Sequence, residues 1–377
     1  MTDFFWRIAM EGDQAGIAHT PTFNRGDANG YHAGNIAPFV RGGEVDSRFS
    51  YIDHALLVAK AAESAGFIGG LLPSFPPTED PWAYSSALLP QTDRFKFMIA
   101  YQPGFLHPLQ VARQAATFQR LSGGRLVFNV ISGGGGDAQL WWGDRIAHDD
   151  RYVRTKEFLD ILKGVWSGVP FDYDGRFFRT AGAALPPQLR GQEFPELYFS
   201  GSSDAAIDAA GRHADYYLSW LEPRAQLVEK ISRVREYAAS IGQAPKIAIR
   251  VEVLSRRTPE AAWRVVERAW ERPGQGSLRG GAGDSVGAAR VASAVPESSH
   301  WRDLEIEPNI WAGFNRLRPG PARGIVGSYE QVAQRLQELI DIGVDSFILA
   351  GNPHLEEVAR VGEEVLPLLG ARRLVTT

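Results

Sequence analysis

The stretch Glu196–Trp220, ELYFSGSSDAAIDAAGRHADYYLSW, contains a short apolar run, a turn of small residues, a helical pattern and a second apolar run. The runs Glu196–Phe199 and Asp215–Trp220 have the length and aromatic content of strands, and Asp204–Arg212 has helical periodicity. Two strands joined through a helix pair in parallel by a right-handed crossover. The stretch therefore predicts one βαβ unit of an α/β fold.

The same alternation recurs on both sides of this unit. Six further apolar runs are predicted strands: Phe4–Ala9, Phe67–Leu72, Phe95–Tyr101, Arg125–Ile131, Lys246–Leu254 and Asp345–Ala350. The remaining predicted helices are Tyr51–Ala65, Asp80–Leu89, His107–Leu121, Tyr152–Trp166, Arg224–Ile241, Pro259–Trp270, Tyr329–Ile342 and Leu355–Leu369. Eight strand–helix units over 377 residues favour a (β/α)8 TIM barrel. An open Rossmann-like sheet is the alternative, but no Gly-x-Gly-x-x-Gly fingerprint opens the first unit.

Three stretches interrupt the alternation, and we expect them to be insertions in a single domain spanning residues 1–377. They lie at about 20–48, 168–194 and 271–309. The last is irregular in pattern and falls between the seventh and eighth predicted strands, on the side where barrel active sites form. A long loop at this place is typical of a lid or a binding segment, so we predict a lid.

Composition narrows the classes of function. The 40 basic and 44 acidic residues give a net charge of −4, which disfavours a nucleic-acid binder. The absence of cysteine excludes disulfides, thiolate metal sites and iron–sulfur clusters. No apolar run is long enough to cross a membrane, and no leader pattern opens the chain. We expect a cytoplasmic protein without nucleic-acid or membrane partners.

Two motifs carry candidate chemistry. Phe199–Asp204 runs from a strand through small residues into a helix, which suits an anion at the helix start; plain helix capping by Ser202 or Ser203 is the alternative. Three arginines within Arg316–Arg323 suit an anionic oxygen ligand, against the alternative of a solvated basic loop. The histidines and carboxylates lack metal-ligand spacing, so we expect no metal site.

The chain resembles the bacterial luciferase-like flavin-dependent monooxygenases, and most closely the two-component alkanesulfonate monooxygenases. The segments that carry the resemblance are Ala112–Thr117, Leu121–Arg125, Arg151-Tyr152, Gly201–Asp204, Pro308–Gly313 and Asn352–Glu357. The resemblance implies a TIM barrel with insertions that uses FMN in its reduced form, FMNH2, with O2 as co-substrate. A separate NAD(P)H-dependent FMN reductase would supply the flavin. An organosulfonate would lose sulfite and leave an aldehyde. Relatives are homodimers or homotetramers, and we expect one of these states.

The resemblance also assigns roles to individual positions. Catalytic roles in sulfonate binding and at the reacting flavin fall on Arg250, Arg318 and His354. Flavin binding falls on Asn129, Ser132, Tyr152, Ser200, Gly201, Ser202 and Ser203, with Ser202 and Ser203 at the phosphate, Tyr152 nearby, and Asn129 and Ser132 at the ring or the ribityl chain. Substrate-pocket positions are Glu11, Trp220, Glu252 and Asn352.

Four of the family's pocket residues are replaced in this chain. Glu252 and Glu11 stand where the alkanesulfonate enzymes have histidines, Asn352 replaces a tyrosine, and Thr78 replaces a cysteine. Two added carboxylates repel an anion unless they bind a hydroxyl or an amine. The replacements favour a polar organosulfur substrate, such as a hydroxylated or sugar sulfonate. They leave open a simple alkanesulfonate, a sulfone or a nitrogen heterocycle, a deazaflavin-dependent dehydrogenase, and a flavin-binding protein without catalysis.

Overall fold

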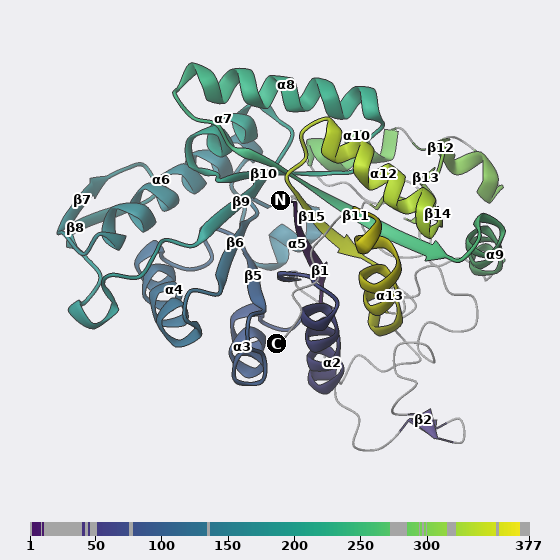
Figure 1. Ribbon diagram of the computed structural model, residues 1–377. Helices are drawn as coiled ribbons and strands as arrows, with labels where there is room; N and C mark the ends of the chain where they lie inside the picture. The colour runs from purple at the N-terminus through teal and green to yellow at the C-terminus, as the bar shows by residue number, and fades with distance from the viewer. Residues whose placement is uncertain are drawn as a thin grey trace.

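The computed structural model describes residues 2–8, 10, 40–41, 44–45, 51–74, 78–133, 136–271, 285–293, 295, 298, 300–314, 322–351 and 354–369. Parallel strands form a closed barrel surrounded by helices (Figure 1). In order around the barrel they are β1 (Asp3–Arg7), β4 (Gly69–Leu72), β5 (Lys96–Tyr101), β6 (Leu126–Val130), β9 (Glu196–Ser200), β10 (Tyr216–Trp220), β11 (Lys246–Arg256) and β15 (Ser346–Ala350). The β15–β1 and β10–β11 pairings complete the closure. The predicted TIM barrel is confirmed, with its strands at the predicted places.

Helices follow the strands. They are α2 (Tyr51–Ser64), α3 (Pro81–Leu88), α4 (Pro108–Ser122), α6 (His148–Trp166), α7 (Asp204–His213), α8 (Arg224–Ser240), α9 (Pro259–Trp270), α12 (Tyr329–Asp341) and α13 (His354–Arg360). Local sequence explains their starts: the Asp80 carboxylate and the Thr258 hydroxyl accept hydrogen bonds from the backbone N–H groups of Ala83 and Ala261.

One predicted helix boundary was wrong, and one predicted helix is not of a single type. Helix α6 begins at His148 rather than Tyr152, because Asp149 and Asp150 occupy its first turn, where negative charge stabilises a helix N-terminus. The predicted helix Leu355–Leu369 changes type along its length. It continues after α13 as a π-helix over Val361–Val365 and a 3-10 helix over Leu366–Leu369.

Alternate residues of the barrel strands face inward and outward. The inward residues form one buried cluster: Phe5, Leu71, Met98, Ala100, Val127, Tyr198, Tyr216, Leu218, Ala248 and Ile348. Within it Tyr198 stacks on Tyr216 with ring centroids 4.2 Å apart. Their outward neighbours pack against the helices in a second and larger cluster. A filled interior leaves only the ends of the barrel for a ligand.

The insertions contain more regular structure than predicted. The first includes the short pair β2 (Val40–Arg41) and β3 (Glu44–Val45), and its other residues lie outside the described part. The second forms the antiparallel hairpin β7 (Phe171–Asp174) and β8 (Arg179–Ala183), at the left of Figure 1, and a 3-10 turn over Pro187–Leu189.

The third insertion was predicted to be irregular, and its described part is not. It contains α10 (Val286–Ser293), a 3-10 turn over Trp301–Leu304 and β12 (Glu305–Glu307). Strand β12 pairs with β13 (Ile310–Trp311), and β13 pairs with β14 (Gly324–Ser328), a strand that the sequence did not predict. Strand β14 extends the sheet along the outer half of β11. Four tryptophans give this region its own core: Trp263, Trp270, Trp301 and Trp311.

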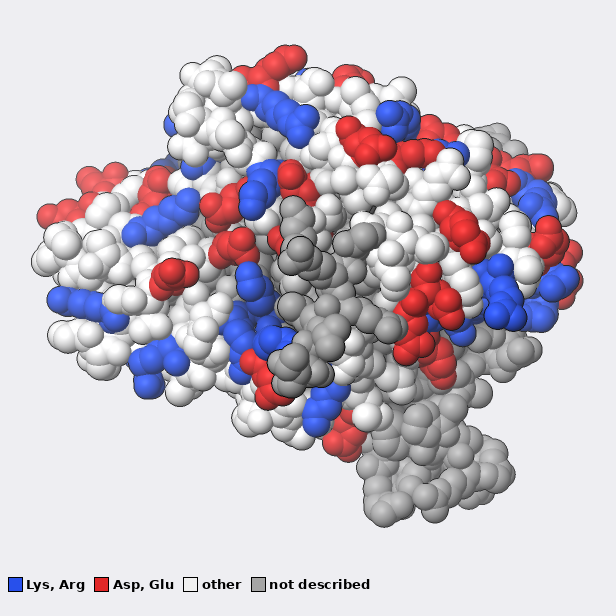
Figure 2. Space-filling view, viewed as in Figure 1, with Lys and Arg blue, Asp and Glu red and all other residues white. Residues whose placement is uncertain are grey.

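Acidic and basic side chains are interspersed on the face seen in Figure 2. The mixture agrees with the near balance of 40 basic and 44 acidic residues in the sequence. Among the helices that the structure describes, none has the length and apolar character needed to cross a membrane.

We expect His213, the last residue of α7, to make stability depend on pH. Burial, and then the positive charges of Lys163 and Arg212, lower the pKa of His213 to about 4 from 6.5. The unfolded chain therefore binds this proton first, and the free energy of unfolding decreases as pH falls from 6.5 to about 4. This decrease in the free energy of unfolding is at most about 3 kcal/mol. The negative charge of Asp208 opposes this lowering of the pKa.

Urea unfolding of the wild type and of His213→Gln between pH 4 and 7.5 measures this effect. The variant is expected to show a flatter dependence on pH. Parallel curves for the two proteins would contradict the assignment.

Candidate functional site

Several polar side chains face the carboxyl end of the barrel interior. They lie two residues beyond members of the inward cluster, on the same side of their strands: Arg7, Gln102, Asn129, Ser200, Trp220 and Arg250. This end is where TIM-barrel enzymes build their sites. Four of the predicted site residues are in this group, whereas Arg7 and Gln102 were not predicted.

Trp220 and Arg250 lie side by side, because the register pairs them on neighbouring strands. Arg250 donates from Nη2 to Oε1 of Glu252 at 3.1 Å, and the Glu252 side chain is almost fully buried. At Glu252 strand β11 passes from its pairing with β15 to its pairing with β14. The two residues were predicted as separate candidates, and the structure brings them together as an ion pair.

Two amide oxygens at this end accept no hydrogen bond from the described residues. They are Oδ1 of Asn129 and Oε1 of Gln102, and both atoms are buried. Buried polar atoms are normally hydrogen-bonded. These two acceptors are suited to a ligand that carries N–H groups.

The turn between β9 and α7 is tightly packed. A Cβ atom on Gly201 would lie 2.3 Å from Cβ of Ala206 and 2.9 Å from the Tyr152 hydroxyl, so only glycine fits. Ser203 caps α7 by accepting a hydrogen bond from Ala206 N at 3.2 Å. The helix-cap interpretation therefore holds for Ser203. The hydroxyl of Ser202 does not cap the helix and makes other contacts.

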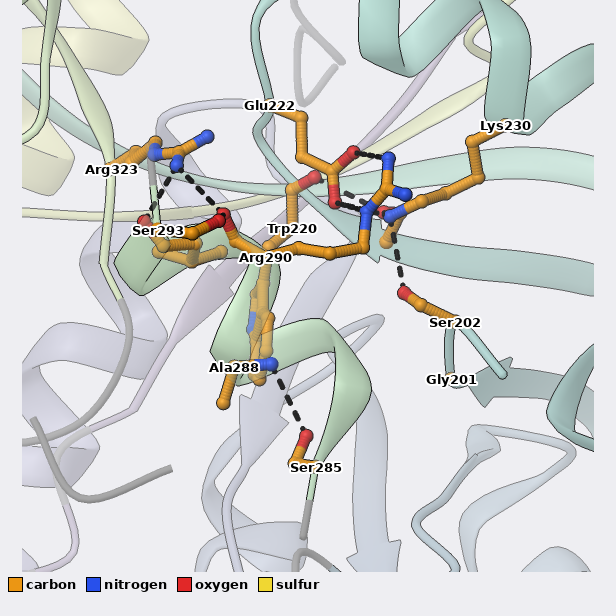
Figure 3. Close-up of polar contacts among 12 residues, drawn as sticks. Gly201, Ser202, Trp220, Glu222, Lys230, Ser285, Ala288, Arg290, Ser293 and Arg323 are labelled. Carbon is orange, nitrogen blue, oxygen red and sulfur yellow. Dashed lines mark hydrogen bonds and ion pairs between the residues drawn. The ribbon is translucent and has the colours of Figure 1, made fainter. Parts of the chain in front are cut away.

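Ser202 lies at the edge of a cluster of charges (Figure 3). Lys230 of α8 donates to Oγ of Ser202 and Oγ of Ser219, both at 3.1 Å, and to the Glu222 carboxylate. Arg290 of α10 donates to both oxygens of Glu222, at 3.2 and 2.9 Å. Glu222 is 1% exposed and Lys230 is 4% exposed. One buried carboxylate thus joins a barrel helix to the third insertion.

Arg323 adds a third cation to this cluster. It is 3% exposed and donates from Nη2 to the carbonyl oxygens of Arg290 and Val291, at 3.3 and 2.6 Å. Its Nε and Nη1 have no hydrogen-bond acceptor among the described residues. Arg323 belongs to the predicted arginine-rich segment, and its burial excludes a solvated loop at this position. We call Glu222, Lys230, Arg290 and Arg323 the cationic cluster.

The pKa shifts agree with this geometry. Burial acts to raise the pKa of Glu222, but the hydrogen bonds from Arg290 and the charge of Lys230 outweigh it and hold this pKa below its usual value. Burial lowers the pKa of Lys230, and Glu222 opposes that shift. The neighbouring Arg290 and Arg323 lower the pKa of Lys230 further. An additional negative charge here would relieve the repulsion among the cations.

The sequence contains a signal for Lys230 that was missed. Lys230 occupies a position on the apolar face of α8, among Leu227, Ile231 and Val234, all of which are buried. A lysine at a core position of an amphipathic helix indicates a buried partner. For Arg290 the sequence offers no comparable signal, because its helix lies in a stretch with no clear pattern.

A buried ion pair fixes the loops that follow β5 and β6. Arg154 donates to Asp144 at 2.6 and 3.2 Å, and Asp144 also accepts from Gln139 and from the backbone of Ile146. Gly104 lies against the Arg154 guanidinium: a Cβ there would come within 2.4 Å of it, and φ is +108°. Arg154 therefore positions loop residues on two sides of the barrel mouth. It was not predicted as a site residue.

The other predicted residues have different outcomes. Ser132 hydrogen-bonds with Thr155 at 3.1 Å, which fixes its hydroxyl against α6. His354 is fully buried at the start of α13, with its ring edge-on to Trp6. Thr78 donates weakly to Pro73 O at 3.5 Å. Three positions, Glu11, Arg318 and Asn352, lie outside the described residues. In the part of the chain that the structure covers, no three histidine or carboxylate side chains are placed to hold a metal ion.

Comparison with solved structures finds the same fold. A riboflavin lyase matches with a TM-score of 0.70 and 19% identity over 100% of this chain and 93% of its own. The EDTA monooxygenase from Chelativorans sp. BNC1 matches with a TM-score of 0.68 and 18% identity, over 100% and 95%. An F420-dependent secondary alcohol dehydrogenase matches with a TM-score of 0.63 and 19% identity, over 84% and 95%. At these identities the likeness shows the fold alone.

The sequence itself matches a family model. Residues 31–346 match the luciferase-like monooxygenase family, which covers most of the chain and all the barrel strands between β4 and β11. The β10–β11 pairing, the Gly201 turn and the polar residues at the carboxyl end other than Arg7 lie within the matched range. By this match the chain belongs to the luciferase-like monooxygenase family.

Proposed function

We propose that this protein is an FMN-dependent monooxygenase that takes reduced FMN from a separate NAD(P)H-dependent reductase and cleaves the C–S bond of an organosulfonate. The observation that carries the choice of cofactor is the cationic cluster beside Ser202. It places three cations around one carboxylate, next to the first turn of α7. A phosphate monoester carries close to two negative charges at neutral pH, which matches that excess.

The flavin ring has complementary partners at the barrel mouth. The unpartnered oxygens of Asn129 and Gln102 are acceptors for N–H groups of the isoalloxazine ring. The Gly201 turn leads from the carboxyl end of β9 to Ser202 beside the cationic cluster, and the Tyr152 hydroxyl lies against this turn. The residues that are present thus fit both ends of FMN, and Ser200 and Ser132 are further candidates for contacts with the flavin.

When bound, the reduced flavin supplies two electrons that let O2 place one oxygen atom in the substrate and the other in water. In the proposed reaction a carbon–sulfur bond breaks, and sulfite and an aldehyde are formed. The chain's own part is to bind the sulfonate, orient it and exclude water. Arg250 beside Trp220 is suited to the sulfonate, together with Arg318 and His354.

The Arg250–Glu252 ion pair favours a second candidate. A carboxylate that takes up part of the charge of Arg250 weakens the site for a simple anion and provides an acceptor for a substrate hydroxyl or amine. A hydroxylated sulfonate meets both conditions, with Glu11 and Asn352 as further pocket positions. A sulfone or a nitrogen heterocycle, oxidised by the same flavin chemistry, is the alternative.

A deazaflavin coenzyme fits less well. The phosphate of F420 is a diester with a single negative charge, one less than the excess positive charge of the cluster. An F420-dependent alcohol dehydrogenase has the same fold, so F420 is the alternative coenzyme to test. Binding of FMN and F420 measured side by side separates the two.

We expect sulfite release under air with FMN, an FMN reductase and NADH for at least one member of a panel of alkyl, hydroxylated and sugar sulfonates. Arg250→Ala is expected to lower kcat/KM about 10- to 100-fold, because one charge-assisted contact to the anion is lost. Arg268→Ala, an exposed change on α9, is the charge-matched control. Reduced FMN binding without sulfite from any sulfonate would contradict the C–S reaction and favour a sulfone or a nitrogen heterocycle as the substrate. Gel filtration of the same preparation measures the expected homodimer or homotetramer.

A further inference from the structure

We propose that the flavin phosphate and helix α10 stabilise each other, because Lys230 and Arg290, joined by Glu222 beside Ser202, together form the phosphate site. This inference rests on the proposed function. It adds a regulation of the site: phosphorylated flavin, and not the flavin ring alone, fixes α10 on the barrel.

The first step is the charge balance. The cationic cluster contains Lys230, Arg290 and Arg323 against Glu222 alone, and its members other than Arg290 are nearly or fully buried. Buried charge without compensation is costly. A dianionic group beside Ser202 would neutralise the excess, whereas riboflavin, which has no phosphate, would not.

The second step is the position of α10. A Cβ on Gly287 would lie 3.2 Å from the Trp220 ring and 3.3 Å from Oγ of Ser202, so the first turn of α10 lies directly against both residues. Ser285 caps that turn by accepting from Ala288 N at 3.2 Å. Figure 3 shows this turn below the side chains of Trp220 and Arg290, with Ser202 beside them. A group bound at Ser202 is therefore adjacent to the starts of α7 and α10.

The third step is the attachment of α10. The bidentate Arg290–Glu222 pair and the bonds from Arg323 to the carbonyls of Arg290 and Val291 both connect this helix to the rest of the protein. Both connections pass through the cationic cluster. A ligand that lowers the repulsion within the cluster strengthens both, and by linkage the attached helix strengthens the binding of that ligand by the same factor.

Hydrogen exchange read by mass spectrometry, with FMN and riboflavin affinities from flavin fluorescence, tests the coupling on the full chain. Saturating FMN is expected to slow exchange in the peptide that covers 286–293 about tenfold or more, and riboflavin is expected to leave it unchanged. Arg290→Gln is expected to lower the affinity for FMN about 10- to 100-fold, because one charge-assisted contact to the phosphate is lost. The affinity for riboflavin is expected to stay unchanged. Arg290→Lys should restore part of the FMN affinity.

The control is Arg268→Gln, which removes one positive charge from the exposed face of α9. Equal protection of α10 by FMN and riboflavin, or an equal loss of both affinities in Arg290→Gln, would overturn the coupling. Inorganic phosphate provides an arm that does not depend on the flavin. If neither flavin binds, the proposed function fails. In that case, protection of α10 by phosphate in the wild type but not in Arg290→Gln supports the anion site. If phosphate does not protect α10 in the wild type, the anion site is overturned.

Discussion

Replacing Glu222 with alanine is expected to lower the free energy of unfolding by about 3–5 kcal/mol, because it leaves buried cations without their carboxylate. Glu222 is 1% exposed and accepts from Lys230 and from two nitrogens of Arg290. Without it, Lys230 and Arg290 repel each other, and α10 loses one of its attachments. Urea unfolding followed by tryptophan fluorescence measures the change.

The design of this experiment separates charge from shape. Glu222→Gln keeps the shape of the side chain and removes its charge. Its free energy of unfolding should therefore decrease by most of the amount expected for Glu222→Ala. Glu236→Ala, at an exposed position of α8, should stay within about 0.5 kcal/mol of the wild type. Added phosphate is expected to restore part of the stability of Glu222→Ala, since an anion that binds the folded state stabilises it. A variant as stable as the wild type would show that the cluster does not need its carboxylate.

The second large effect is expected at Arg154. Arg154→Ala leaves the carboxylate of Asp144 buried without a cation, which costs about 3–5 kcal/mol of the free energy of unfolding. The side chains of the pair are only 7% and 3% exposed, so water cannot replace the guanidinium. The substitution also removes the packing of Arg154 against Gly104, and it leaves Asp144, which accepts from Gln139, without its cation. We therefore expect flavin affinity to fall about tenfold or more as the loops at the barrel mouth lose their support.

A double variant distinguishes the ion pair from the packing. Asp144→Asn combined with Arg154→Met removes both charges at similar volume, and is expected to be more stable than Arg154→Ala. If the double variant is the less stable of the two, the contribution of Arg154 is packing against Gly104 rather than charge. Arg113→Ala on the exposed face of α4 is the control for removal of an arginine.

The barrel could be predicted because its signals are local. Each strand is a short apolar run such as Lys246–Leu254, and each is followed by a helical pattern within a few tens of residues. Parallel pairing and closure then follow from general rules of connection. The Gly201–Asp204 turn could be identified for the same reason, since a glycine and two serines between a strand and a helix form a local pattern.

The third insertion could not be predicted, since its order comes from distant partners. Strand β14 exists because it pairs with the outer half of β11, about 70 residues earlier in the chain (Glu252 with Gly324). Its core forms because Trp263 stacks near Trp301, on elements separated by α10. No spacing within the segment carries that information.

The sequence by itself determined the alternation of strands and helices, the closed barrel and the small-residue turn at its carboxyl end. Only the tertiary structure decided that Ser202, Glu222, Lys230, Arg290 and Arg323 meet at one place. The physical reason is range: periodicity and capping act over a few residues, whereas a charge finds its partner wherever the fold brings the two together. The buried lysine of α8 and the arginine of α10 are recognised as one site only because both donate to the carboxylate between them.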